Sequence, residues 1–439
     1  DGGLAYQASV LVTWVWVDSV NRLYISDIHD CRIRVLSFTT GIITKFAGDD
    51  SCSGPTGDNI TATSAYISPA AVFGDTYGNV YFTDSQGARV RKIDTTGIIS
   101  TIAGSVSGYV DGDASSALFS NLFSLWMNSL GDFFVVDFGN NALRKITKST
   151  NKVSTIVGGI GYGYNGENLA GTSTQLAQPY DVMGDTAGNV YIVQLTNRVS
   201  RLSVSTGNVT TFAGTGSGDN GGENIPATSC PLNTPYKVWI ATDGNVYISE
   251  NAGNKVRKVD ASGIITTFAG TGVSGFSGDG SFAASAQLNR PQGLTMDSVG
   301  RMFVADTSNN RVRMIGEAFI GTVISRSPTA TPTRQPTVQP TIVPSSRPTC
   351  QPSQPSSHPT KQPSSQPSVQ PSCRPSAQPS AVPTTQPSTP TSFPSGEPSV
   401  LPSNNPTRVP SSRPSSQPTN PTAQPSSQPS TQPTSQPTS

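Results

Sequence analysis

The stretch GIITTFAG, residues 263–270, has four relatives elsewhere in this chain. They are GIITKFAG (41–48), GIISTIAG (97–104), NKVSTIVG (151–158) and GNVTTFAG (207–214). Successive copies end 56, 54, 56 and 56 residues apart. Self-similarity at a fixed period of this length indicates an array of identical supersecondary units.

Each unit has the pattern of four short β-strands separated by small polar turns. In the unit that ends at Gly270, the expected strands are YKVWIA (236–241), GNVYISE (244–250), NKVRKVD (254–260) and GIITTFAG (263–270). β-Branched runs broken by Gly, Asn and Asp are typical of antiparallel hairpins. Six such units, whose second strands begin at Leu23, Val80, Phe133, Val190, Val246 and Met302, indicate an all-β protein of the β-propeller type over residues 1–325.

Several motif blocks recur in fixed order and resemble NHL repeats. They are DGNVYISE (243–250), NRVRMI (310–315), IITTFAG (264–270) and the linker GFSGDGSFAASAQLNRPQGL (275–294). The resemblance covers nearly all of residues 1–325 and implies a six-bladed propeller.

The two ends of the predicted propeller bear on how the ring closes. The opening DGGLAYQASVLVTWVWVD (1–18) matches the linker without its first residues and does not begin with methionine. We therefore expect a mature or truncated terminus inside an inter-blade loop, with all four strands of blade 1 present. FIGTVIS (319–325) is expected to be the fourth strand of blade 6. The ring would then close by face packing between blades 6 and 1, without strand exchange.

The resemblance also raises an enzymatic alternative. NHL propellers include a lyase of peptidylglycine derivatives whose zinc is held by several histidines. This chain has two histidines, His29 and His358, whereas a catalytic zinc site needs three protein ligands and an open position. We therefore expect no catalytic residues and no cofactor.

The loops between units are rich in Gly and Asp, and four of their acids are candidate calcium ligands: Asp111, Asp113, Asp219 and Asp279. Carboxylate oxygens suit Ca²⁺. The same composition suits a geometric role, because Gly permits positive φ and Asp caps turns. Since a loop of this kind recurs at each crossing between units, the geometric role is favoured and no metal site is predicted.

The charge balance argues against a nucleic-acid platform. Of 28 Lys and Arg and 27 Asp and Glu, seven basic residues and one acid lie from residue 326 onward, which leaves 21 basic against 26 acidic before it. Basic triplets occur in the third strands as RIR (32–34), RVRK (89–92), LRK (143–145) and KVRK (255–258). We interpret them as solvated strand faces matched by nearby acids. No run of 18 apolar residues is present, so no membrane span is predicted.

Five cysteines, an odd number, say little about the compartment. Cys31 and Cys52 could form a disulfide in the first repeat, and free thiols are the alternative. Cys230 stands alone. Cys350 and Cys373 lie in the C-terminal region.

Residues 326–439, here called the tail, have a strict proline rhythm. From Pro328 to Pro437 there are 29 prolines, 25 of the 28 intervals are four residues long, and every proline is followed by Ser or Thr. Proline fixes φ, and the favoured state is a polyproline II helix with about 3 residues per turn. A period of four then turns each successive Pro-Ser/Thr by about 120°, so the hydroxyls wind around all faces of the rod.

Ser/Thr tracts with Pro are typical of O-glycosylated stalks. The tail also resembles hydroxyproline-rich glycoproteins of plant and algal walls, which implies possible hydroxyproline and attached sugar. The predicted O-glycosylation sites are Thr329, Thr333, Thr337, Thr341, Ser345, Thr349, Ser364, Ser368, Ser372, Ser376, Ser380, Ser415, Ser426, Ser430, Thr434 and Thr438. The candidate hydroxyprolines are Pro363, Pro367, Pro371, Pro425, Pro429, Pro433 and Pro437. Sequons at Asn59 and Asn208 predict N-glycans.

These features together predict an extracellular structural glycoprotein: a propeller head on a glycan-coated rod that assembles into a fibre, wall or surface appendage. The expected partners are covalent glycans and other copies of this or related chains in a filament, with no nucleic acid. The alternative is an adhesin- or receptor-type binding head on a glycosylated spacer stalk.

Overall fold

The computed structural model describes residues 1–8, 10–50, 57–316 and 319–325. Backbone contacts divide the chain into units at residues 1–339 and 340–439. The tail lies outside the described residues, and so does the predicted polyproline II conformation. The expected boundary between the propeller and the tail, after residue 325, coincides with the end of the described residues.

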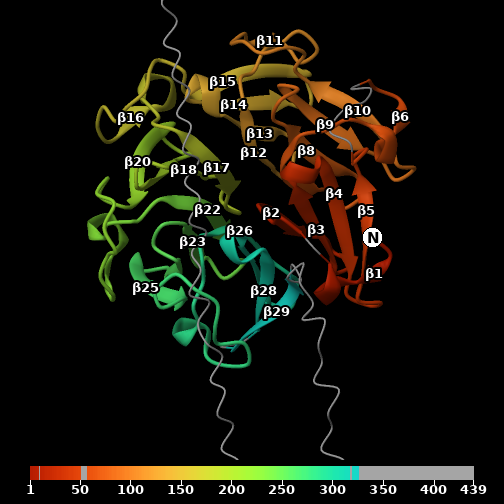
Figure 1. Cartoon of the computed structure of the whole chain (residues 1–439). Helices are drawn as coiled ribbons and strands as arrows, with labels where there is room; N and C mark the ends of the chain where they lie inside the picture. The colour runs from red at the N-terminus through yellow and green to blue at the C-terminus, as the bar shows by residue number, and fades with distance from the viewer. Residues whose placement is uncertain (9, 51–56, 317–318, 326–439) are drawn as a thin grey trace, which may run out of the picture. The chain divides into compact units, whose positions relative to one another are not determined.

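The described residues form six antiparallel sheets around a common axis (Figure 1), and the four main strands of each sheet follow one another in chain order from the axis outward. The first strands line the axis: β2 (Trp14–Val17), β7 (Pro69–Gly74), β12 (Leu122–Met127), β17 (Pro179–Gly184), β22 (Pro235–Ile240) and β26 (Pro291–Met296). The second strands are β3 (Arg22–Asp27), β8 (Val80–Asp84), β13 (Phe133–Asp137), β18 (Val190–Gln194), β23 (Val246–Glu250) and β27 (Met302–Asp306). The predicted six-bladed all-β propeller is confirmed.

The outer half of each blade follows the predicted repeat. The third strands are β4 (Arg32–Ser37), β9 (Arg89–Ile93), β14 (Ala142–Thr147), β19 (Arg198–Leu202), β24 (Lys255–Val259) and β28 (Arg311–Gly316). The fourth strands are β5 (Ile42–Ala47), β10 (Ile98–Ala103), β15 (Lys152–Gly158), β20 (Asn208–Ala213), β25 (Ile264–Ala269) and β29 (Phe319–Ser325). The prediction that residues 319–325 complete blade 6 is therefore confirmed.

Five blades also have a two-residue fifth strand that the sequence pattern did not predict. These strands are β1 (Gly3–Leu4), β6 (Ile60–Thr61), β11 (Gly112–Asp113), β16 (Leu169–Ala170) and β21 (Ile225–Pro226). Each precedes its own blade and pairs with that blade's fourth strand, as Ile60 does with Ile99. It covers an edge whose backbone N–H and C=O groups would otherwise be unpaired.

Short 3-10 turns connect these strands: η1 (Ala5–Gln7), η2 (Ile28–Asp30), η3 (Ala62–Ser64), η4 (Phe138–Asn140), η5 (Gly171–Ser173), η6 (Ala227–Ser229), η7 (Ala283–Ser285) and η8 (Thr307–Asn309). The described residues contain no α-helix, and none of their helical segments is long and apolar enough to cross a membrane.

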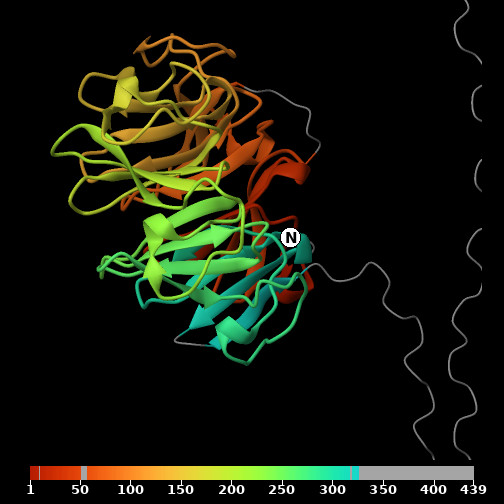
Figure 2. The same cartoon turned by 90° about the vertical axis from the view of Figure 1, so that its left-hand side faces the viewer.

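The core lies between neighbouring sheets. Every residue of β8, β13, β18, β23 and β27 is buried, including residues that point to opposite faces. Successive side chains of a strand alternate between faces. Both faces of each sheet are therefore covered by the adjacent blades, which the views from two sides also show (Figures 1 and 2).

Ring closure occurs by face packing, as expected. β2 of blade 1 lies against β26 of blade 6. The Gly293 amide donates to the Thr13 carbonyl oxygen at 3.2 Å. The rings of Phe38 and Phe303 stack with centroids 5.0 Å apart. Each described strand remains in the sheet of its own blade, so the two ends of the propeller exchange no strand within the part of the chain that the structure describes.

Candidate functional site: the propeller channel and the inter-blade loops

The central channel is the usual place to look for a ligand in a propeller. At one level, each first strand contributes one residue: Trp14, Ala71, Ser124, Asp181, Lys237 and Gly293. The five residues with side chains are all buried, with Trp14 and Lys237 the most exposed at 6% each. The polar members of this layer meet near the axis.

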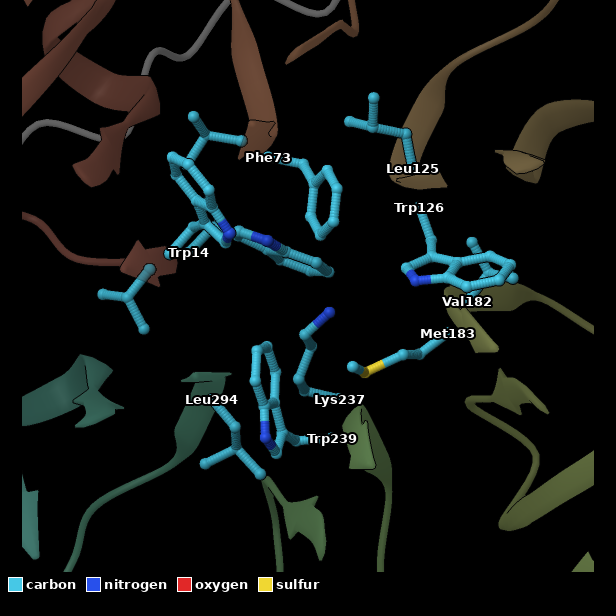
Figure 3. A pocket seen from close by; sticks show the side chains of 12 residues that line it. Trp14, Phe73, Leu125, Trp126, Val182, Met183, Lys237, Trp239 and Leu294 are labelled. Atoms are coloured by element: carbon cyan, nitrogen blue, oxygen red, sulfur yellow. The ribbon is translucent and has the colours of Figure 1, made fainter. Parts of the chain in front are cut away.

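Lys237 extends from β22 towards the centre of the channel (Figure 3). Its Nζ lies 2.9 Å from Asp181 Oδ1 and 4.2 Å from the centre of the Trp14 ring. Asp181 also accepts from Ser124 Oγ at 2.6 Å and from the Val238 amide at 2.8 Å. Burial lowers the pKa of Lys237, and Asp181 opposes this shift. The carboxylate has three donors, so it is fully satisfied by the protein.

Aromatic side chains fill the channel beside this layer. All four tryptophans of the chain line it, together with Phe73 and Met183. The remaining cavity is about 10 Å³, the size of a single water molecule. Gly74 lies against the Trp16 ring so closely that a Cβ there would come within 2.2 Å of it. At this level the channel is therefore packed, and the cavity has no space for an organic ligand.

Buried arginines lie on the third strands, contrary to the expectation that the basic triplets are solvated. Arg91, Arg144, Arg257 and Arg313 have no exposed surface, and Arg34 has 3%. The expectation was wrong because it assumed one solvent-facing side for each sheet, whereas both sides of these strands pack against other residues. A buried guanidinium requires an anionic partner.

Each of the four fully buried arginines pairs with the last residue of the second strand in its blade. The pairs are Arg91–Asp84 (3.4 Å), Arg144–Asp137 (2.6 Å), Arg257–Glu250 (3.3 Å) and Arg313–Asp306 (3.3 Å). Burial raises the pKa of each of these four acids, and the arginines oppose the shift. In blade 4, both charges are replaced, and Gln194 Nε2 donates to Ser200 Oγ at 2.8 Å.

The loop acids considered as calcium ligands have structural partners instead. Asp111 accepts from Arg144 Nη2 at 2.6 Å, and Asp279 Oδ1 lies 2.5 Å from Arg313 Nη2. Asp113 lies 3.9 Å from Lys152, and Asp219 accepts from Ser217 Oγ at 2.8 Å. Among the described residues, no group of three or more His, Cys, Asp or Glu is arranged so that it could hold a metal ion. Asp111 and Asp279 thus anchor the inter-blade loops to the buried arginines, a role that the sequence analysis missed.

The first repeat contains the single histidine of the propeller region. His29 lies in η2 and is exposed. Cys31 is disulfide-bonded, and Cys52 lies outside the described residues. Cys230 is a buried free thiol whose pKa is raised by burial. His358, Cys350 and Cys373 are outside the described residues.

The two sequons differ in accessibility. Asn59 is exposed and precedes β6, with positive φ. Asn208 begins β20 and is half-buried, and its Nδ2 donates to Asn168 Oδ1 at 3.1 Å. Asn59 is therefore the more open acceptor. The tail sites for O-glycosylation and proline hydroxylation, from Thr329 to Thr438, lie outside the described residues.

A family model described as the PT disordered repeat matches residues 353–389, within the tail. Among curated proteins, the Arabidopsis thaliana protein SUPPRESSOR OF QUENCHING 1, chloroplastic, is 31% identical over 175 residues. That similarity covers 37% of this chain and 16% of the relative, so the chain spans a small part of the relative's length.

Solved structures share the fold at low identity. A protein of unknown function from Bacteroides thetaiotaomicron matches with a TM-score of 0.53 and 15% identity, over 72% of this chain and 71% of that chain. An auxiliary nutrient binding protein from the same organism matches with a TM-score of 0.51 and 16% identity, over 71% and 69% of the two chains. At this identity the likeness establishes the propeller fold alone.

Proposed function

We propose that this chain is an extracellular structural glycoprotein in which a propeller head carries a glycan-coated rod, and that it assembles with other copies or related chains into a filament, wall or surface appendage. The observation that carries the proposal is the unbroken pairing of all 29 tail prolines with a following hydroxyl side chain. A spacer needs only low hydrophobicity and stiffness, and would tolerate Ala, Glu or Lys at those positions.

The composition of the tail and the packing of the head support this proposal together. The PT-repeat match at 353–389 agrees with an extended, Pro- and Ser/Thr-rich region. The channel that would hold a substrate is filled by Trp14, Lys237 and their neighbours. Repeated buried ion pairs and face-to-face blade packing suit a rigid head in a load-bearing assembly.

Electron microscopy of native material tests the assembly. We expect regular filaments in which propeller-sized heads repeat along the axis. Isolated heads on single stalks at native concentration would contradict assembly and favour the alternative of a binding head on a spacer. Enzymatic removal of O-linked sugar before imaging separates the contribution of the glycan, since filaments held by a glycan-stiffened rod are then expected to disperse.

A further inference from the structure

A large cleft lies away from the axis of the propeller. It lies between blades 2 and 3, measures about 760 Å³ and opens beside the turns at residues 75–79 and 128–131. Blade 2 contributes Tyr77, Tyr81, Lys92 and Ile102, and blade 3 contributes Phe133 and Lys148 among others. A cleft of this volume is in the range of small-molecule and oligosaccharide sites.

The cleft lies where blade 2 lacks an aromatic residue that blades 1, 4 and 5 have. In blades 1, 4 and 5, a tyrosine of the second strand meets a phenylalanine of the fourth strand edge-on, with ring centroids 4.9–5.0 Å apart. Blade 2 keeps the tyrosine, Tyr81, but has Ile102 at the phenylalanine position. The Tyr81 ring packs instead against Phe133 of blade 3, and Ile102 lines the cleft. Blade 3 also has an isoleucine there, but Trp126 covers its Phe134 ring at 5.2 Å.

Asp75 organises the rim of the cleft. Its carboxylate accepts from the amides of Tyr77 and Asn79, both at 2.9 Å, and from the Tyr81 hydroxyl at 3.0 Å. These bonds fix the turn that carries Tyr77, whose side chain is 81% exposed. A rigid turn thus presents a flat aromatic surface at the entrance, while Tyr81 and Phe133 form an apolar floor with rings 4.8 Å apart.

The cleft is positively charged. Lys92 and Lys148 approach it from the two blades. Neither lysine forms an ion pair within the described part of the chain. Asp75 also lines the cleft, and its hydrogen bonds lower its pKa and keep it ionised, so the two lysines and this carboxylate give the lining one net positive charge. The two ammonium groups favour an anionic ligand.

We propose that this cleft binds an acidic saccharide, with a sugar ring on Tyr77 and carboxylate or sulfate groups on Lys92 and Lys148. The remaining polar lining consists of hydroxyl and carboxamide side chains, namely Thr76, Asn79, Asn128, Ser129 and Asn151, which suit sugar hydroxyls because these both donate and accept. An acidic peptide is disfavoured, since β8, β9, β13 and β14 each have strands on both sides and offer no free edge for strand addition.

Isothermal titration of the full chain tests the site with three hexasaccharides: oligogalacturonate, a sulfated galactan fragment and a neutral galactan fragment. Both acidic probes, or one of them, are expected to bind at least tenfold more tightly than the neutral one, and their order distinguishes carboxylate from sulfate as the recognised group. Equal binding of all three would overturn the proposal. Binding of a hexaglutamate peptide without saccharide binding would also overturn it.

Matched variants locate the binding. Ile102→Phe restores the residue found in blades 1, 4 and 5, so it should fill the cleft and weaken binding at least tenfold, whereas the opposite change Phe268→Ile in blade 5 should leave affinity unchanged. The saccharide affinity of the Lys92→Gln variant is compared with that of Lys258→Gln, which changes the equivalent residue of blade 5. Full affinity in Ile102→Phe with an unchanged unfolding midpoint would refute the site.

Two substitutions of exposed residues test the site independently, in case the Ile102→Phe variant does not fold. Tyr77→Ala is expected to lose affinity, while Val299→Ala, at the equivalent and 71% exposed turn of blade 6, should not. Equal effects of the two would refute the site. The inference does not rest on the tail: failure of saccharide binding leaves the proposed assembly intact, and an unmodified tail leaves the cleft intact.

Discussion

Arg144 Nη1 lies 2.6 Å from Asp137 Oδ2, and neither side chain has exposed surface. Arg144→Met would leave the Asp137 carboxylate buried without its cation, and we expect a loss of about 3–5 kcal/mol in the free energy of unfolding. Urea denaturation measures it. Blade 4 supplies the matched control, because Gln194 and Ser200 form a neutral version of the pair. The double variant Asp137→Gln with Arg144→Ser should recover much of the loss, and additive losses would contradict this account.

Asp27 occupies the position in blade 1 that Asp137 occupies in blade 3. Its carboxylate has fewer hydrogen-bond partners. Within the described residues its Oδ1 has no hydrogen-bond partner, and burial raises its pKa to about 6. The folded state therefore holds a proton that the unfolded state has released, between pH 4 and 6. Stability from this group is complete below pH 4 and is lost as pH rises to 7, by up to about 3 kcal/mol.

The substitution Asp27→Asn removes this loss. The variant should gain stability relative to the natural protein at pH 7.5 but not at pH 4, as measured by urea denaturation at both values. Asp94→Asn is the control with the opposite sign, because hydrogen bonds from Thr96 and Ile98 lower the pKa of Asp94. A parallel pH dependence of the Asp27→Asn variant and the natural protein would show that Asp27 is not the titrating group.

Gly293 allows blade 6 to approach blade 1 closely. A Cβ there would lie 2.9 Å from the Val15 amide nitrogen and 3.0 Å from Trp14 Cα. We expect Gly293→Ala to destabilise the propeller by about 1–3 kcal/mol, since overpacking forces backbone shifts. Gly321→Ala in β29 is the matched control, because a Cβ there has no neighbour within 4 Å. Equal thermal unfolding midpoints for the two variants would contradict close packing of blade 6 against blade 1 at Gly293.

The repeat GIITTFAG and its copies were sufficient to predict the fold, the blade count and the role of residues 319–325, because strand number and order depend on local patterning. The burial of Arg91 and its counterparts was not predicted, since alternation along a strand cannot say whether the second face meets water or another sheet. A signal was nevertheless present: blade 4 lacks both the acid and the arginine, having Gln194 and Ser200.

The inter-blade cleft was missed for a different reason. Considered alone, Ile102 is an ordinary apolar residue of a strand. It becomes informative only when it is compared with Phe46, Phe212 and Phe268, which occupy the same position in other repeats. The packed channel also escaped prediction, because the approach of Lys237 to Asp181 joins residues from different blades whose relation depends on ring closure.

The tail should carry O-linked sugar on most hydroxyls that follow proline. Mass spectrometry of tail peptides from native protein measures the occupancy at Ser426, Thr434 and Thr438. Ser435, which does not follow proline, is an internal control and should be modified less. Unmodified Pro-Ser/Thr pairs throughout the tail would reduce it to an ordinary linker.

Purified protein should contain no stoichiometric zinc. The chain has two histidines, and His29 is the one within the propeller region. Elemental analysis of native protein, with His29→Ala as a comparison, measures the metal content. One zinc per chain that is lost in His29→Ala, accompanied by lyase turnover, would contradict a non-catalytic head.

The position of β29 determines how tension would enter the propeller. β29 is the outermost strand of blade 6 and is hydrogen-bonded to β28, with Ser325 opposite Arg311 at the open end of the hairpin. If the proposed assembly pulls on Ser325 away from β28, this ladder would open one residue pair at a time, beginning at Arg311 and Ser325. The contacts of Gly293 with blade 1 lie at the opposite, inner edge of the same sheet. In the proposed assembly, β29 would therefore separate from β28 before the contacts between blades 6 and 1 are broken.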